Sequence, residues 1–281
     1  TDKLHEKCGV VGVYSRGEQA SRLAYFALSA LQHRGQESSG IISSTGREFF
    51  AHGGAGLVAQ VYKESDLQMM KGNMAIGHNR YATSGQKHDR HIQPIHRGDD
   101  VMAFAHNGNI HSTVALKKFL RSKKLLKAGT NDSEMMADAI RYYIYTGSTP
   151  DEAIKASWPL FTGAFSCVMM TRDAIYAFRD KYGIRPLSLG KLGRTGYVVA
   201  SETCAFDMLG ARFVRDIAPG ELVEVSKKGF KKWQIEPSEL KLEIFEFIYF
   251  ARPDSVLQGK LVNEARRRLG RKLAREHPIK R

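Results

Sequence analysis

Side chains that could carry out chemistry gather at five places in the chain, each beside an apolar run. Cys8 stands directly before a glycine and a short apolar stretch. The other four places are polar clusters at residues 32–36 (QHRGQ), 77–83 (GHNRYAT), 105–109 (AHNGN) and 130–134 (TNDSE). A lone thiol is usually a small core residue, but polar clusters at predicted strand ends are costly to hold without a purpose. The combination indicates a candidate site for nucleophilic chemistry.

The elements that must position these residues follow from the hydrophobic pattern. Residues 9–14 predict a short buried strand, and apolar residues at 20, 23, 24, 27, 28 and 31 have helical spacing. Further strands are predicted at 39–43, 48–52, 74–78, 101–106, 164–170, 174–178, 196–201 and 221–225. Helices are predicted at about 113–121, 134–145, 150–158 and 264–275. Strand runs with clustered helices favour an α+β fold of packed sheets covered by helices over a parallel βαβ array.

Composition is that of an ordinary globular protein with a full core. The chain has 281 residues, of which 42% are hydrophobic and 26% charged, and a formal net charge of +14. No apolar run approaches the roughly 20 residues of a membrane helix, and no signal-peptide pattern follows the polar start. A cytoplasmic protein without membrane contact is therefore predicted. The dense basic cluster at 260–281 favours a solvated helix face or the start of a further domain over nucleic-acid binding.

Cysteine spacing argues against disulfides and against a zinc motif. The chain contains Cys8, Cys167 and Cys204, which are too widely scattered for a disulfide framework or a CxxC pair. Cys167 lies in an apolar run and Cys204 in a short segment before Phe206. These two are predicted to be buried structural thiols.

Two further patterns invite a ligand but lack the residues that would complete it. His88, His91 and His96 lie close together, yet no Cys or spaced carboxylate completes a metal-ligand set, so solvent-exposed loop histidines are predicted. Residues 53–56 (GGAG) lack the Lys-Ser/Thr of a phosphate loop and the spacing of a dinucleotide site. A tight turn is predicted there.

A series of motifs occurs in the order found in glutamine phosphoribosylpyrophosphate amidotransferases: CGVVGV, LQHRGQ, IGHNRYATSG, AHNGN, NDSE, RDKYGIRPL, SETCAFD and YFARPDS. The chain resembles this family from Cys8 to about Leu269. CGVVG alone would also suit glucosamine-6-phosphate synthase or asparagine synthetase, which use the same N-terminal-nucleophile glutaminase domain. LQHRGQ, SETCAFD and YFARPDS point to the phosphoribosyl enzyme.

The resemblance implies a fold and a domain plan. Residues 8–240 are expected to form a glutamine amidotransferase domain, a four-layer αββα sandwich of the N-terminal-nucleophile hydrolase type. Residues 1–7 are expected to be a propeptide, and 241–281 a linker and the beginning of a truncated phosphoribosyltransferase domain. Some family members hold an iron–sulfur cluster, but the region where one of its cysteines would stand has Glu243 and no Cys. No cofactor is expected in this chain, and Mg²⁺ is expected only with the missing domain.

Amide hydrolysis needs a nucleophile, a proton shuttle, an oxyanion site and a grip on the amino-acid end of glutamine. By the resemblance, Cys8 is the nucleophile. If Thr1–Lys7 were removed, its new α-amine, with a pKa of roughly 8, could accept the thiol proton. As an internal residue Cys8 has an amide nitrogen, which cannot act as a base, so the sequence is expected to be that of a precursor.

The resemblance assigns the oxyanion site to the side chain of Asn107 and the backbone N–H of Gly108. A glycine would also let the backbone come within hydrogen-bond reach of substrate. The alternative for this pair is a simple Asn-Gly turn.

Glutamine has a carboxylate and an ammonium group, so its site needs an Arg and an acid. The resemblance assigns these to Arg80 and Asp132, for which the alternatives are a surface charge and a helix cap. Arg34 and Gly35 resemble residues that line the nucleophile pocket. Residues 80–85 (RYATSG), which include Tyr81, resemble a mobile loop that closes over glutamine.

The leading functional hypothesis is hydrolysis of glutamine to glutamate and ammonia. In the family the ammonia is used with phosphoribosyl pyrophosphate to make 5-phosphoribosylamine in purine biosynthesis, and family members form tetramers or dimers, so a homo-oligomer is expected. One alternative is an uncleaved, catalytically silent regulatory or assembly module of the same fold. Another is the glutaminase domain of an enzyme like glucosamine-6-phosphate synthase, which the SETCAFD and YFARPDS segments disfavour.

Overall fold

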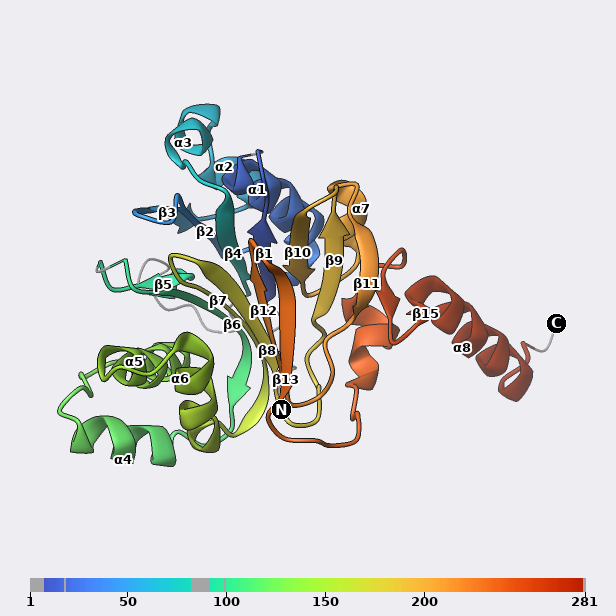
Figure 1. The fold of residues 1–281 in the computed structure, drawn as a ribbon. Helices are drawn as coiled ribbons and strands as arrows, with labels where there is room; N and C mark the ends of the chain where they lie inside the picture. The colour runs from blue at the N-terminus through green and yellow to red at the C-terminus, as the bar shows by residue number, and fades with distance from the viewer. Residues whose placement is uncertain (1–7, 18, 82–90, 99, 280–281) are drawn as a thin grey trace.

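Two antiparallel sheets form the framework of the chain in a computed structural model, which describes residues 8–17, 19–81, 91–98 and 100–279 (Figure 1). The first sheet contains seven strands, in the order β11 (Arg212–Asp216), β9 (Ser188–Leu192), β10 (Gly196–Ala200), β1 (Gly9–Tyr14), β4 (Met74–Arg80), β2 (Ser38–Ser44) and β3 (Phe49–Ala55). The second contains six strands, in the order β13 (Gly229–Gln234), β12 (Glu221–Ser226), β8 (Ala174–Arg179), β7 (Gly163–Met170), β6 (Ala103–Ile110) and β5 (Ile95–His96). Neighbouring strands in both sheets pair antiparallel, which confirms the expected α+β class.

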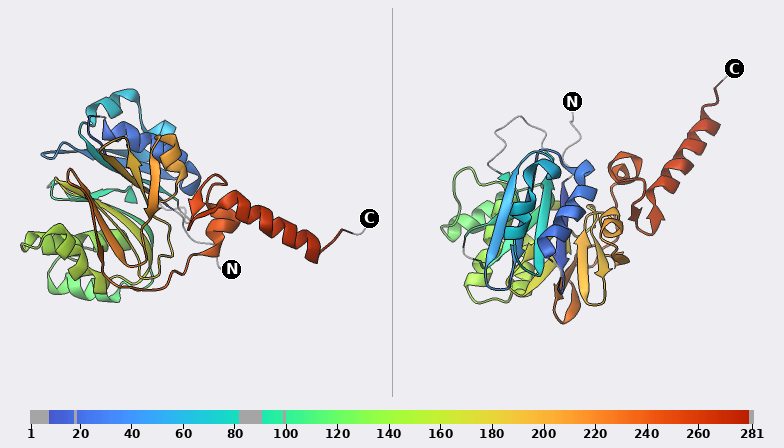
Figure 2. Two further views of the ribbon diagram at one scale, coloured as in Figure 1. Left: turned by 45° about the vertical axis from the view of Figure 1, so that its right-hand side comes forward. Right: turned by 90° about the horizontal axis from the view of Figure 1, so that it is seen from above.

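Most of the helices lie against the outer faces of the two sheets (Figures 1 and 2). The first sheet is covered by α1 (Ala20–Ala30), α2 (Val58–Val61), α3 (Glu64–Met69) and α7 (Cys204–Met208). The second is covered by α4 (Val114–Ser122), α5 (Asp132–Tyr145) and α6 (Pro150–Ser157), which the short 3₁₀ turn η3 (Trp158–Leu160) follows. The observed bounds of α4, α5 and α6 agree with the predicted helices to within two residues.

Apolar residues between the sheets form a core separate from those beneath the helices. The position of β1, with apolar clusters on both of its faces, explains why its sequence is continuously apolar. Val10 belongs to the cluster between the sheets, whereas Val11 and Val13 pack on the helix side. Since successive strand side chains point to opposite faces, a strand with both faces covered needs apolar residues at every position.

The glycine-rich run at 53–56 is not the predicted tight turn, because β3 continues through Ala55. Gly53 lies opposite Gly40 of β2, and the segment around Gln93 passes directly over this pair. A Cβ atom at Gly40 would lie 2.2 Å from the carbonyl oxygen of Gln93, and one at Gly53 would lie 3.0 Å from that of Ser39. The glycines therefore permit close backbone packing within a strand, a use that the turn rules do not detect.

Residues 241–279 lie outside the two sheets. They contain the π-helical turn η4 (Glu246–Phe250), the hairpin of β14 (Val256–Leu257) and β15 (Lys260–Leu261), and α8 (Val262–Glu276). Figure 2 shows α8 projecting away from the sheets. A small apolar cluster holds the segment together, formed by Phe247, Ala251, Leu257 and Val262. Within the described ranges, no helix is long and apolar enough to cross a membrane.

Candidate active site

Cys8 directly precedes β1, the middle strand of the first sheet, and its side chain is buried. In the ladder between β1 and β4, Gly9 lies opposite Asn79. Because antiparallel pairing advances by one residue on each strand, the next positions in this ladder are Cys8 and Arg80. On its other side, Arg80 lies opposite Ser38 of β2. The sheet therefore brings the candidate nucleophile, at the start of β1, next to the candidate glutamine-binding arginine, at the end of β4.

Asn107 and Gly108 lie within β6, opposite Ser166 and Phe165 of β7, so the alternative of an Asn-Gly turn is wrong. The Asn107 side chain is fully buried, and neither its oxygen nor its nitrogen has a hydrogen-bond partner among the described residues. Buried amide groups without a partner are rare, because each costs about 1–3 kcal/mol. This side chain is therefore available to bind a ligand that enters the site.

Gly108 is required by its neighbours in the sheet. A Cβ atom at this position would lie 2.1 Å from the carbonyl oxygen of Ala164 and 2.7 Å from the Cα of Phe165, and its φ angle is +154°. The backbone of β7 alone therefore excludes a side chain. Substrate approach, the reason given by the sequence, is not needed to explain the glycine.

A histidine pair joins the two sheets near these residues. Nε2 of His78, in β4, lies 3.2 Å from the carbonyl oxygen of His106, in β6, and Nδ1 of His106 lies 2.8 Å from Oγ of Ser133. Burial lowers the pKa of His78 to about 3 and also lowers that of His106, so both rings are neutral near pH 7. His78 precedes Arg80 by two residues and His106 directly precedes Asn107, so this contact brings the end of β4 close to the part of β6 that carries Asn107 and Gly108.

Asp132 is the first residue of α5, and its carboxylate points back to β6. It accepts a hydrogen bond from the backbone N–H of Ile110 (3.2 Å) and another from that of Ser133 (2.8 Å). The helix cap is Asn131, whose side chain accepts from the N–H of Glu134 (2.8 Å). The alternative that Asp132 is the cap is therefore wrong, and its carboxylate lies beside the strand that carries Gly108.

Arg80 ends β4 with its side chain partly exposed, and its Nε lies 3.6 Å from Oε2 of Glu37. Tyr81 is 42% exposed. Both can therefore meet a molecule that approaches from solvent. The remainder of the predicted loop, residues 82–85, lies outside the described residues.

Arg34 ends the 3₁₀ turn η1 (Gln32–Arg34), and its side chain is fully buried. Its Nε donates to the carbonyl oxygen of Cys8 at 3.1 Å. A Cβ atom on the next residue, Gly35, would lie 2.6 Å from the carbonyl carbon of Arg80 and 2.7 Å from that of Asn79. The QHRG segment thus packs against the ends of both β1 and β4. The catalytic roles of Arg34 and Gly35 stay predictions.

Comparison with known proteins shows which proteins this chain resembles. A family profile described as a glutamine amidotransferase domain matches residues 78–208. The amidophosphoribosyltransferase of Synechococcus elongatus is 44% identical over 283 residues, which cover 99% of this chain and 57% of that protein. The chain is therefore similar to amidophosphoribosyltransferases over nearly its whole length, and its residues 78–208 match a glutamine amidotransferase domain.

Other amidophosphoribosyltransferases give the same result. The Bacillus subtilis enzyme is 38% identical over 280 residues, covering 98% of this chain and 58% of that protein. A solved structure of glutamine phosphoribosylpyrophosphate amidotransferase from B. subtilis, complexed with ADP and GMP, matches with a TM-score of 0.87 at 37% identity, covering 97% of this chain and 59% of that one. The chain thus spans a little over half the length of the amidophosphoribosyltransferases it matches.

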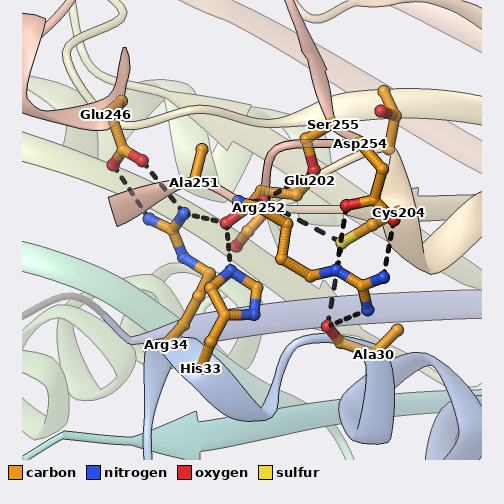
Figure 3. Close-up of polar contacts among 12 residues, drawn as sticks. Ala30, His33, Arg34, Glu202, Cys204, Glu246, Ala251, Arg252, Asp254 and Ser255 are labelled. Atoms are coloured by element: carbon orange, nitrogen blue, oxygen red, sulfur yellow. Dashed lines mark hydrogen bonds and ion pairs between the residues drawn. The ribbon is translucent and has the colours of Figure 1, made fainter. Parts of the chain in front are cut away.

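Two buried glutamates near the amidophosphoribosyltransferase-like site were not predicted as site residues. Figure 3 shows that Glu202 and Glu246 both bind Arg34. Glu202 lies in the SETCAFD motif, and Glu246 interrupts the apolar run EIFEFIYF. An acid inside an apolar stretch is a sequence signal that could have drawn attention to Glu246, because a buried carboxylate requires a partner.

The structure corrects the prediction for two histidines and agrees with that for two cysteines. His91 and His96 are half-buried rather than solvent-exposed. Nδ1 of His91 lies 3.0 Å from Nδ2 of Asn131, and Nε2 of His96 lies 3.3 Å from Oδ1 of Asp100. His88 lies outside the described residues. Cys167 and Cys204 are buried, and burial raises the pKa of both thiols, that of Cys204 to about 12. In the part of the chain that the structure describes, no group of three or more His, Cys, Asp or Glu could hold a metal ion.

Proposed function

We propose that this chain hydrolyses glutamine to glutamate and ammonia, with Cys8 as the nucleophile. The observation that carries the proposal is the buried Asn107 side chain, which lacks hydrogen-bond partners among the described residues. Asn107 lies in β6, and the contact between His78 and His106 joins β6 to β4. Strand β4 in turn pairs with β1, which Cys8 precedes. A thiol near a preformed, unoccupied amide donor suits a reaction in which an oxyanion develops.

The proposed reaction begins once the residues before Cys8 have been removed. The free α-amine accepts the thiol proton, and the thiolate attacks the side-chain amide carbon of glutamine. The Asn107 amide and the Gly108 N–H stabilise the tetrahedral oxyanion. The ammonium form of the α-amine then protonates the departing nitrogen, ammonia leaves, and water hydrolyses the thioester to glutamate and free thiol.

Glutamine is held at its amino-acid end by opposite charges. Arg80, at the end of β4, binds the α-carboxylate, and Asp132, whose carboxylate lies beside β6, binds the α-ammonium group. Tyr81 contributes to the same pocket from the exposed side. Support comes from the contact of Asp132 with the backbone of Ile110, two residues beyond Gly108 in the same strand.

The two sheets with helices on their outer faces support assignment to the four-layer αββα sandwich of N-terminal-nucleophile hydrolases. In this proposal residues 1–7 are a propeptide, 8–240 form the catalytic domain, and 241–281 lead into a phosphoribosyltransferase region. The ammonia is then passed to phosphoribosyl pyrophosphate to form 5-phosphoribosylamine for purine synthesis, in a cytoplasmic homo-oligomer that uses Mg²⁺ in that second region. The names and greater length of the relatives support this wider role.

Three forms of the protein test the proposal: the chain beginning at Cys8, the same chain with Cys8→Ser, and the chain that retains residues 1–7. Glutamate and ammonia release are measured with glutamine as the only substrate. The first form is expected to release both in equal amounts, and the other two to release neither. Activity in Cys8→Ser would exclude the thiol as nucleophile, and activity in the chain with residues 1–7 intact would exclude the α-amine as base.

A further inference from the structure

The Arg34 cluster, comprising His33, Arg34, Glu202, Glu246 and Ser255, joins distant parts of the chain (Figure 3). Arg34 donates to Glu246 through both terminal nitrogens, at 3.0 and 2.9 Å, and also to Glu202. The side chains of all three residues have no solvent exposure. Burial opposes the charge on Arg34, but Glu246 and Glu202 outweigh that effect and raise its pKa above the ordinary value.

We propose that Glu202 and Glu246 are positioning residues for glutamine hydrolysis, because together they fix Arg34 in the orientation in which its Nε–H holds the carbonyl oxygen of Cys8. The inference rests on the proposed glutaminase function. Neither glutamate contacts the substrate in this account, and both act through Arg34.

The shape of the guanidinium group explains why both acids are needed. Its donors lie in one plane and at fixed angles, so a two-point contact with Glu246 sets the position of the terminal nitrogens. The added contact with Glu202 prevents rotation of that plane. The Nε–H direction is then fixed, and it meets the Cys8 carbonyl oxygen at 3.1 Å.

Glu202 is itself held on both oxygens. His33 lies 2.7 Å from Oε1, while Ser255 Oγ (2.7 Å) and the backbone N–H of Arg252 (2.9 Å) donate to Oε2. Burial raises the pKa of Glu202, but the charges of Arg34 and His33 and the hydrogen bonds outweigh this and bring it to about 2. A buried carboxylate with this many donors has a single orientation, which suits a group that must position another.

The position of the Cys8 carbonyl matters because that carbonyl and the thiol share one Cα atom. Rotation of the peptide group after Cys8 would redirect both Sγ and the α-amine relative to Asn107. An error of about 1 Å in a catalytic group, caused by a change far from the chemistry, can cost about 100-fold in rate. Arg34 therefore orients the nucleophile through the backbone carbonyl of Cys8.

Glu246 adds a dependence on a segment outside the sheets. It begins η4, and two carbonyl oxygens of that region, those of Phe247 and Ala251, accept hydrogen bonds from Arg266 of α8, at 2.8 and 2.7 Å. Ser255 and Arg252, which hold Glu202, come from the same segment. The geometry at Cys8 thus depends on how residues 246–255 are seated against η1.

The test uses the chain beginning at Cys8 and the variant Glu246→Gln, which keeps the shape of the side chain but removes its charge. The kcat for glutamine hydrolysis is expected to fall between about 10-fold and about 100-fold, while KM changes less than about 3-fold, because the interaction lost is not with substrate. The matched control is Glu221→Gln. Glu221 is also a buried acid in a two-point pair, with Arg215 at 2.7 and 2.9 Å, but it lies in β12 of the second sheet, whereas Cys8 precedes β1 of the first. The Glu221→Gln control is expected to have the same kcat as the unsubstituted chain.

A double-mutant cycle separates positioning from general loss of structure. In an Arg34→Gln background, Glu246→Gln is expected to lower kcat by less than about 2-fold more, because the route from Glu246 to Cys8 is already broken. Losses that multiply in the double variant would overturn the inference, and so would an unchanged kcat in folded Glu246→Gln. If circular dichroism shows Glu246→Gln to be unfolded, Ser255→Ala is tested instead, because it removes a hydrogen bond that holds Glu202. A kcat loss of about 2- to 5-fold with unchanged KM supports the inference, and no loss overturns it.

Failure of the proposed function gives a different result from failure of this inference. If the unsubstituted chain releases no ammonia, the glutaminase proposal fails and the inference fails with it. If the unsubstituted chain is active and Glu246→Gln is equally active, only the positioning role is wrong.

Discussion

Two buried polar groups lie near Cys8, and they differ in how fully their hydrogen bonds are satisfied. In the Arg34 cluster both carboxylates meet several donors, and Arg34 uses its terminal nitrogens and its Nε. Asn107 is equally buried, but its side chain has no partner among the described residues. A satisfied buried network fixes geometry, whereas an unsatisfied one stores a cost that only a ligand can relieve. The contrast assigns positioning to the first and substrate chemistry to the second.

The largest effect is expected for Asn107→Ala, and it tests the contrast between Asn107 and the Arg34 cluster. Loss of one oxyanion donor should lower kcat by about 100- to 1000-fold. The free energy of unfolding should change by less than about 1 kcal/mol, because the folded protein loses no hydrogen bond of the described residues. Steady-state glutamine hydrolysis and urea unfolding measure the two quantities. A large loss of stability with little loss of kcat would show that Asn107 belongs with the structural groups.

A smaller effect is expected at the Arg34 cluster, where stability should depend on pH. Glu202 has a pKa of about 2 in the folded protein against an ordinary value of 4.5. Because the folded value is the lower one, the ionised form favours folding, and this stability is fully present above about pH 4.5 and is lost as the pH falls toward 2. The shift corresponds to about 3 kcal/mol.

Urea unfolding of the unsubstituted chain and of Glu202→Gln, at a series of pH values from about 2 to about 6, measures this contribution. The unsubstituted chain should lose about 3 kcal/mol more than the variant over the acidic part of the series. Parallel curves would mean that Glu202 is not held by the charge of Arg34.

The sequence predicted the local elements well because their signals are local. The helical spacing from residue 20 onward matches α1, and the Asn131 cluster correctly begins α5. The glycine run at 53–56 was misassigned because Gly53 lies within β3, against the distant segment at Ile92. Close approach between parts of the chain that are far apart in sequence leaves no turn-like signal of its own.

The same limit applies to the candidate site. The resemblance supplied Cys8 and Asn107, and their roles remain proposals. Glu202 and Glu246 were missed because they are 168 and 212 residues from Arg34 along the chain. No periodicity or spacing rule links residues at such separations, and only the folded arrangement of η1, the segment before α7, and η4 does so.

The most direct test of the account is to treat the chain beginning at Cys8 with a diazoketone analogue of glutamine, which alkylates a thiolate that lies in a glutamine site. Mass spectrometry of the peptides then locates the adduct. One adduct is expected, on Cys8, and excess glutamine should prevent its formation. Cys167 and Cys204 should stay unmodified because burial raises the pKa of both thiols. Modification of Cys167 or Cys204, or modification of Cys8 that glutamine does not slow, would contradict it.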